Sequence, residues 1–212
     1  MNVQLLVIAK APVPGQVKTR LCPPCTPEQA TQIAAAALSD TLAAAGATPA
    51  IRHTIVHCGQ IEAPLGWHRV PQRGAGLGAR LAGGFVDTAR PGTGALLIGM
   101  DTPQITPQLL TAVAAGLAEH DAVLGPATDG GWWALALRDP RHGHALLDVP
   151  MSTAETGALT VTALAARGLR VGYGPTLRDV DTASDALAVA DLCADTAFAD
   201  AVRQHLPATV PA

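Results

Sequence analysis

The chain has 212 residues, enough for one α/β domain with a substantial core, and 49% of them are hydrophobic whereas only 3% are aromatic. Its 17 acidic residues outnumber its 14 lysines and arginines, and the resulting net charge of −3 gives no basic face for a nucleic-acid partner. No stretch approaches the roughly 18 consecutive apolar residues of a membrane span, and Met1–Gln4 lacks the basic region of a signal peptide, so we expect a cytoplasmic protein with no membrane partner.

The first apolar segment, Val3–Ala9, is a predicted strand that runs into a positively charged loop. This loop contains both lysines of the chain, Lys10 and Lys18, together with Arg20. Three cations directly after a strand could clamp a triphosphate or a pyrophosphate, and a solvated basic loop is the alternative. A P-loop is excluded because Val17 stands where that motif needs a glycine.

The next segments alternate between predicted helix and predicted strand. A capping box at Thr26 and Gln29 predicts the start of an alanine-rich helix that Gly46 ends. Predicted strands follow at Arg52–Cys58 and Trp67–Pro71.

A glycine-rich turn then opens another predicted helix. It contains Gly74, Gly76 and Gly78, but Ala79 departs from the Gly-x-Gly-x-x-Gly pattern of dinucleotide-binding proteins. Its backbone amides could approach a base or a phosphate closely. A plain tight turn is an equally good interpretation.

The apolar run that contains Leu96–Ile98 is the predicted central strand, and it ends at Asp101. In open α/β sheets, ligands bind outside the carboxyl ends of the strands, so Asp101 is placed to meet a substrate or its metal. A capping role for Asp101 is the alternative. However, Thr106 and Pro107 already supply a good start for the next predicted helix, Thr106–Glu119.

Asp121–Leu124 is another predicted buried strand, and it leads into the sequence Asp-Gly-Gly-Trp-Trp at residues 129–133. In an aromatic-poor chain, paired tryptophans behind two glycines favour a shaped pocket wall. A hairpin turn with a core tryptophan is the alternative. Both can hold, because Trp132 and Trp133 should face opposite sides of the strand that follows.

The last part of the chain has one more helix start, one more strand and two acidic residues of interest. Ser152 and Glu155 form a predicted capping box for a helix that reaches Arg167, and Leu169–Tyr173 is a predicted strand. Beyond it, two further aspartates stand two residues apart and so project the same way in an extended chain, where they could share a cation with the first strand-end carboxylate. These three candidate metal ligands are Asp101, Asp179 and Asp181.

Four ordered motifs resemble those of one family of bacterial proteins. They are Lys-x-Pro-x-Pro-Gly-x-Val-Lys-Thr-Arg-Leu, Gly-x-Asp-x-Pro, Leu-Gly-Pro-Ala-x-Asp-Gly-Gly and Asp-Val-Asp-Thr. From Lys10 to about Leu192 the chain is similar to DUF2064 proteins, also called selenodomain-associated transferase 1. The resemblance implies an α/β fold of the GT-A type, with one domain over residues 1–212 and a mixed, mostly parallel sheet sandwiched by helices. Nucleotide-sugar glycosyltransferases and nucleotidyltransferases share this fold.

The resemblance also implies roles for individual residues. The nucleotide-binding set comprises Lys10, Lys18, Arg20, Gly74, Gly76, Gly78 and Asp101. The acceptor-binding set comprises Asp129, Gly130, Gly131, Trp132, Ser152 and Thr153. Two departures bear on the acceptor, because Met151 replaces the family's usual tryptophan and Trp132-Trp133 replaces a more common tyrosine pair.

Together, the residues and the resemblance predict an enzyme that transfers a group from a nucleotide donor with the help of Mg²⁺ or Mn²⁺. Asp101, Asp129 and Lys18 are the expected catalytic residues, with Lys18 stabilising phosphate charge and Asp129 orienting or deprotonating an acceptor hydroxyl. Glycosyl transfer from a nucleotide-sugar to a small acceptor is the first hypothesis. Nucleotidyl transfer from a nucleoside triphosphate to a phosphorylated small molecule, with pyrophosphate released, is the second, and a non-catalytic nucleotide-binding module is the third. The oligomeric state stays open, with a homodimer among the alternatives.

Overall fold

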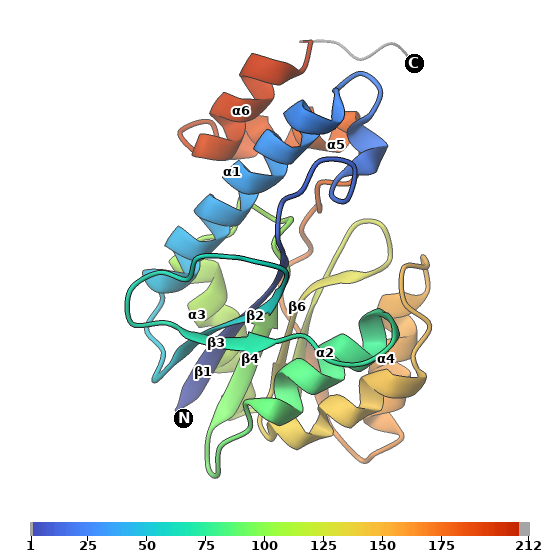
Figure 1. The fold of residues 1–212 in the computed structure, drawn as a ribbon. Coiled ribbons are helices and arrows are strands. Elements are labelled where there is room, and N and C mark those ends of the chain that lie inside the picture. Colours follow the sequence, from blue (N-terminus) through green and yellow to red (C-terminus); the bar gives the residue numbers. More distant parts are fainter. Residues whose placement is uncertain (1, 208–212) are drawn as a thin grey trace.

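Seven strands form one sheet in the part of the chain that the structure, a computed structural model, describes, which is residues 2–207 (Figure 1). In chain order they are β1 (Val3–Lys10), β2 (His53–Cys58), β3 (His68–Pro71), β4 (Gly94–Ile98), β5 (Ala122–Pro126), β6 (Trp132–Leu137) and β7 (Val171–Tyr173). Their order across the sheet is β3-β2-β1-β4-β6-β5-β7. Strand β6 is antiparallel to both of its neighbours and the other pairings are parallel, so the predicted mixed, mostly parallel sheet is confirmed.

Helices connect these strands and cover the sheet. The α-helices are α1 (Pro27–Gly46), α2 (Gly76–Asp87), α3 (Pro107–Ala115), α4 (Thr156–Ala165), α5 (Ala183–Leu192) and α6 (Ala197–His205). Short 3-10 helices lie at η1 (Thr19–Leu21), η2 (Gly116–Ala118) and η3 (Pro140–Asp148). Among residues 2–207, no helix is both long enough and apolar enough to cross a lipid bilayer.

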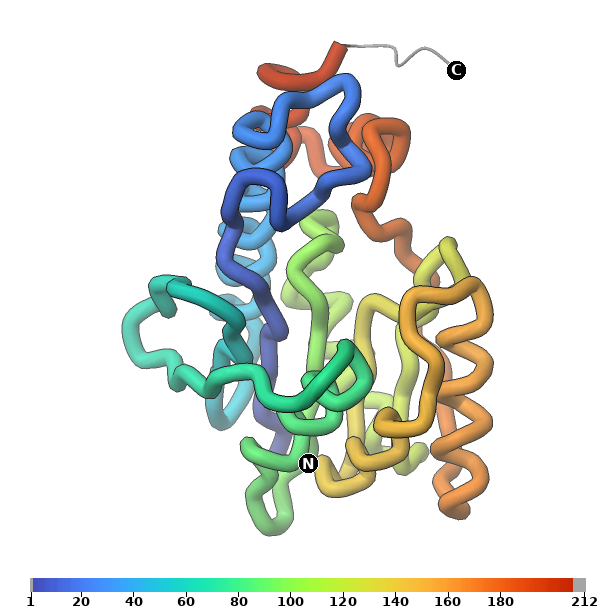
Figure 2. The backbone as a smooth tube through the Cα atoms, turned by 45° about the vertical axis from the view of Figure 1, so that its right-hand side comes forward, coloured from blue at the N-terminus to red at the C-terminus, as the bar shows by residue number. Residues whose placement is uncertain are grey.

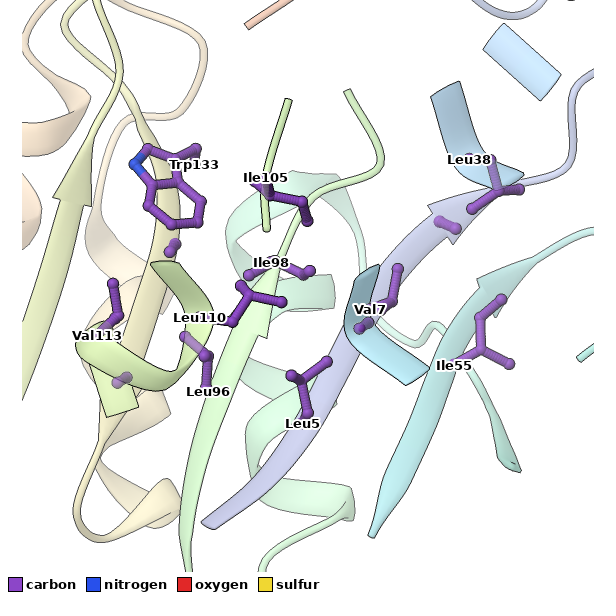
Figure 3. Packing of buried hydrophobic residues seen from close by; sticks show 14 of the residues in the cluster. Leu5, Val7, Leu38, Ile55, Leu96, Ile98, Ile105, Leu110, Val113 and Trp133 are labelled. Atoms are coloured by element: carbon purple, nitrogen blue, oxygen red, sulfur yellow. The ribbon is translucent and has the colours of Figure 1, made fainter. Parts of the chain in front are cut away.

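Strand residues alternate between two hydrophobic layers. On one face, α1 and α3 pack against the sheet, and Figure 3 shows Leu110 and Val113 of α3 over Leu96 of β4. On the other face, Phe85 of α2 packs in a cluster with Leu97, the next residue of β4. Burial on both faces explains why the central strands are continuous apolar runs in the sequence.

A third hydrophobic cluster lies beyond the carboxyl edge of the sheet. There α5 and α6 pack on α1, together with Leu21 of η1 and Val180. Figure 2 shows the result, with the blue loop after β1 beside the red C-terminal helices. This layer brings the segment around residues 10–21 next to the segment around residue 180, although they are far apart in the chain.

One predicted helix start is wrong. Helix α4 begins at Thr156, and no side chain caps it at Glu155. An N-cap residue has an extended backbone, whereas Ser152 has φ +61° and is left-handed, so it cannot be the N-cap. The Thr156 hydroxyl instead donates to the Pro150 carbonyl and accepts from the Thr153 amide, so this hydroxyl organises the turn before the helix.

Candidate functional site

The predicted charged residues meet at the carboxyl edge of the sheet. Asp101 follows β4, Asp129 follows β5, and Lys18 follows β1. The segment with Asp181 reaches the same edge because the Val180 amide donates to the Asp101 carbonyl, with 2.9 Å between the nitrogen and the oxygen. Parallel strands end at one edge, so the topology itself gathers these side chains.

Lys18 lies between two of the predicted metal ligands. Its Nζ atom is 3.1 Å from Asp101 Oδ2 and 3.4 Å from Asp181 Oδ1. The side chain of Lys18 is 12% exposed, whereas those of Asp101 and Asp181 are each 37% exposed. The ammonium group therefore sits behind the carboxylates, and it neutralises them from the protein side.

The electrostatic setting of Lys18 follows from this arrangement. Burial would lower the pKa of Lys18, but the negative charges of Asp101 and Asp181 outweigh burial and raise the pKa above its ordinary value. The residue is also held at φ +46°, a backbone conformation that is uncommon for a lysine. Lys18 and Ser152 are the non-glycine residues with positive φ in the described part of the chain, and the resemblance placed both of them at the site.

The other two cations of the loop are open to solvent. Arg20, whose side chain is 73% exposed, has its NH1 nitrogen 3.0 Å from Asp181 Oδ2. Lys10 Nζ donates to the Gln16 carbonyl at 3.1 Å, and this bond closes the loop on itself. Both groups are placed to exchange these weak surface contacts for an anionic ligand.

Three carboxylates form a second group beside Lys18. Oxygen atoms of Asp129, Asp179 and Asp181 all lie within 4.8 Å of one another. The structure thus places Asp179 and Asp181 together as the sequence analysis expected, and it adds Asp129, whose predicted role was acceptor binding. Asp101 is directed to Lys18, but its charge still acts on Asp179.

The crowding of negative charge shows in Asp179. Burial, followed by the charge of Asp129, raises the pKa of Asp179 to about 6. Asp101 and Asp181 add smaller effects in the same direction. Like charges at this spacing oppose full ionisation unless a cation joins them, and oxygen ligands of this kind suit Mg²⁺ or Mn²⁺.

The loop that carries Asp129 has a defined backbone. Asp129 Oδ1 accepts from the Gly131 amide at 2.8 Å. Gly130 has φ +89°, and a side chain there would collide with the carbonyl of Ala154. The Gly157 amide donates to the Gly130 carbonyl at 2.8 Å. These contacts tie the Asp129 loop to the start of α4, and Gly130 is needed for the shape of the loop.

The glycine-rich turn before α2 divides into two parts. Gly74 and Gly76 are exposed and have positive φ values. Gly78 is buried, and a Cβ atom there would lie 2.5 Å from the Leu146 carbonyl oxygen. The structure therefore leaves Gly74 and Gly76 accessible to a ligand, whereas it gives Gly78 a packing role between α2 and η3.

The two tryptophans lie on opposite sides of β6, and only Trp132 belongs to the predicted acceptor-binding set. Trp132 is half-buried, and its indole nitrogen donates to Thr160 of α4. Trp133 is buried in the opposite layer, where its indole nitrogen donates to the Pro175 carbonyl. The predicted opposite orientation is confirmed, and Trp133 is the core anchor. Ser152 and Thr153 are exposed in the turn before α4.

One contributing residue was not predicted. Gln104 Nε2 donates to the Arg178 carbonyl and so holds the segment that carries Asp179 and Asp181 against the loop after β4. No local pattern in the sequence indicates this contact, because the two segments are 74 residues apart.

A family model described as "Uncharacterized protein conserved in bacteria (DUF2064)" matches residues 29–153. A comparison with curated proteins gives no significant match. Among solved structures, the chain is similar to a protein from Desulfovibrio desulfuricans that is provisionally described as a nucleotide-diphospho-sugar transferase. The two share 23% identity over 96% of this chain and 95% of that one, with a TM-score of 0.83.

Two other solved structures have the same fold at lower similarity. A CMP:2-keto-3-deoxy-manno-octonic acid synthetase complexed with CTP shares 11% identity over 92% of this chain and 99% of that one, with a TM-score of 0.59. A Mycobacterium tuberculosis protein, Rv0371c, complexed with manganese, shares 18% identity over 90% and 98%, with a TM-score of 0.54. At these identities the similarity establishes the fold, in agreement with the predicted architecture.

Proposed function

The chain belongs to the DUF2064 family, and from this premise we propose that it is a divalent-metal-dependent transferase that uses a nucleotide donor. The observation that carries the proposal is the convergence of four aspartates with Lys18 and Arg20 at one edge of the sheet. Two solved structures with this fold support a nucleotide donor: one is provisionally described as a nucleotide-diphospho-sugar transferase, and the other is a synthetase complexed with CTP. The proposal includes a single transferase domain over residues 1–212 and a cytoplasmic location.

The carboxylates fit a hard divalent cation. Asp179 and Asp181 would hold it, with Asp129 as the third protein ligand, because these three offer oxygen atoms at mutual spacings within 4.8 Å. Burial and the neighbouring carboxylates raise the pKa of Asp179, so a bound cation would favour its ionised form. When bound, Mg²⁺ or Mn²⁺ would neutralise negative charge on the donor phosphates.

The protein groups have separate tasks in this proposal. Lys18 holds the carboxylates of Asp101 and Asp181 in place beside the cation, and Arg20 can exchange its surface contact with Asp181 for donor phosphate. Gly74 and Gly76 offer backbone amides on the donor side. Asp129 is the most exposed of the three clustered carboxylates, and the oxygen that does not bind the cation orients an acceptor hydroxyl and takes its proton.

Glycosyl transfer is the first form of the proposal. The acceptor oxygen attacks the sugar carbon, its proton passes to a carboxylate, the bond between carbon and donor phosphate oxygen breaks, and a nucleoside diphosphate leaves. The structural similarity to the Desulfovibrio protein supports this form. The exposed turn around Ser152 and Thr153, next to the Asp129 loop, is the proposed acceptor side.

Nucleotidyl transfer is the second form, and the basic loop favours it. An acceptor phosphate attacks the α-phosphorus of a nucleoside triphosphate, and the bond to pyrophosphate breaks. Pyrophosphate requires cations beyond the α-phosphate, and the exposed side chains of Lys10 and Arg20 are placed to supply them.

The test is a thermal-shift and calorimetric panel of nucleoside triphosphates and nucleotide-sugars, each with and without Mn²⁺. A Mn²⁺-dependent response to one nucleotide-sugar and its diphosphate product supports glycosyl transfer, whereas a selective response to a triphosphate supports nucleotidyl transfer.

Asp101→Asn should abolish metal-dependent donor turnover. Asp191→Asn, at an exposed position, is the matched control. Binding of a nucleotide without any turnover would support the third hypothesis, a non-catalytic module, and silence throughout would contradict a nucleotide ligand.

A further inference from the structure

A cavity of about 280 Å³ lies at the opposite edge of the sheet from the candidate site. It is lined by Ile51, Arg52, His68 and Arg90. Arg52 directly precedes β2, His68 begins β3, and Arg90 lies in the turn before β4, so all three belong to the amino ends of parallel strands. The cavity is therefore separated from the aspartate cluster by the length of the central strands, on the order of 15–20 Å.

The lining has one sign of charge. Three of its four side chains are nitrogen bases, and none is a carboxylate. Within residues 2–207, neither Arg52 nor Arg90 forms an ion pair, whereas seven other arginines do. In a protein with a net charge of −3, two unpaired guanidinium groups at one cavity are a local excess of positive charge.

Arg52 has an unmet hydrogen-bonding requirement. Its Nε–H group is buried and has no hydrogen-bond partner within the described residues. Such a buried donor is costly in free energy, and because Nε is closed to solvent, an anion in the cavity would meet the terminal nitrogens of the Arg52 guanidinium group rather than Nε. Because a guanidinium group presents its donors as a rigid fork, the matching ligand is a tetrahedral or planar anion that accepts two hydrogen bonds at once.

We propose that this cavity binds a phosphate dianion, either free or as the phosphate of a small phosphomonoester. Arg52 and Arg90 contribute the charge-assisted hydrogen bonds, and His68 lies at the exposed rim. Binding here is independent of the nucleotide donor and of the proposed transferase reaction, because no residue of the aspartate cluster lines the cavity.

The test uses the whole protein and inorganic phosphate as the probe, at constant ionic strength set with chloride. Isothermal titration gives the affinity, and backbone amide chemical shifts locate the binding. We expect phosphate to shift the amide resonances of residues 51–53 and 88–93. We expect Arg52→Gln and Arg90→Gln each to weaken binding about ten-fold, since each removes a charge-assisted contact. Arg52→Lys, which keeps the charge but loses the fork, should weaken binding less.

Arg69→Gln is the matched control, because Arg69 is an exposed neighbour in β3 that does not line the cavity. Thermal melting without phosphate verifies that every variant is folded. An equal response to phosphate and chloride overturns the proposal, as does binding that Arg69→Gln weakens as much as Arg52→Gln. A second arm with glycerol 3-phosphate distinguishes the sources, since tighter binding of the ester identifies an organic phosphate and tighter binding of the inorganic ion identifies free phosphate.

Discussion

Lys18 determines the charge balance of the candidate site, and we expect its removal to lower the free energy of unfolding. Lys18→Met leaves the carboxylates of Asp101 and Asp181 facing a buried apolar chain. We expect a loss of roughly 1–3 kcal/mol in the free energy of unfolding, because half-buried charges lose their partner. Denaturant unfolding at neutral pH measures this change.

Two further variants separate this effect from the general loss of a surface charge. Arg20→Gln breaks only an exposed ion pair and should cost about 0–1 kcal/mol. The double variant Lys18→Met with Asp101→Asn should recover part of the loss, since it removes the charge that the lysine compensates. Equal costs for Lys18→Met and Arg20→Gln would contradict the buried role of Lys18.

Asp179 makes the stability depend on pH in a direction opposite to that of an ordinary ion-paired aspartate. Its carboxyl keeps its proton up to about pH 6 in the folded protein but only to about pH 3.8 in the unfolded chain. Between these values folding binds a proton, so the stability contributed by Asp179 falls as the pH rises through this window. Asp179→Asn should therefore melt at a higher temperature than the parent at pH 7.5, and the difference should shrink toward pH 5.

The control for this pH dependence is Asp191→Asn, at an exposed position on α5.

Added Mn²⁺ should raise the melting temperature of the parent at pH 7.5 more than that of Asp179→Asn, because the variant lacks one of the carboxylates proposed to bind the cation. A constant melting difference from pH 5 to 7.5 would show that Asp179 ionises normally.

At the scale of elements, the turn between β5 and β6 depends on one glycine. Gly130→Ala must place a side chain at φ +89° and against the Ala154 carbonyl. Gly168 is the matched comparison, because it has φ +77° and open space around it. Gly168→Ala should therefore cost only the backbone strain of about 1–2 kcal/mol. We expect Gly130→Ala to cost more than Gly168→Ala in denaturant unfolding and also to weaken Mn²⁺ binding, because it displaces Asp129.

The elements themselves were largely predictable, because their signals are local. The capping box at Thr26 and Gln29 begins α1, which ends at Gly46 as expected. The apolar run before Asp101 is β4, buried along its whole length. The predicted start of α4 was wrong for a physical reason. Ser152 offers the right side chain but stands in a left-handed turn, and the hydroxyl of Thr156 organises that turn through bonds to Pro150 and Thr153.

At the scale of the molecule, the composition of the site depends on contacts that no local pattern reveals. Asp129 joins Asp179 and Asp181 because Ala127 pairs with Leu177 at the end of β5, a contact between segments 50 residues apart. Asp101 was correctly placed at the carboxyl edge because the end of a buried strand can be recognised locally, where its apolar run stops. Its partner Lys18 follows β1, the parallel neighbour of β4, and this pairing of strands about 90 residues apart in the chain is not shown by any local spacing rule.

The two edges of the sheet should respond to different ligands, and hydrogen exchange can follow both in one experiment. With Mn²⁺ and the nucleotide that gives the largest thermal shift, we expect slower exchange in residues 11–20, 127–131 and 178–182, because donor binding orders the loops of the carboxyl edge. Residues 51–53 and 88–93 should be unchanged by the nucleotide and protected by inorganic phosphate. Asp101→Asn supplies the control, since it should lose the first pattern and keep the second. Protection that spreads evenly over both edges with either ligand would contradict two separate sites and would indicate instead a general stabilisation of the fold.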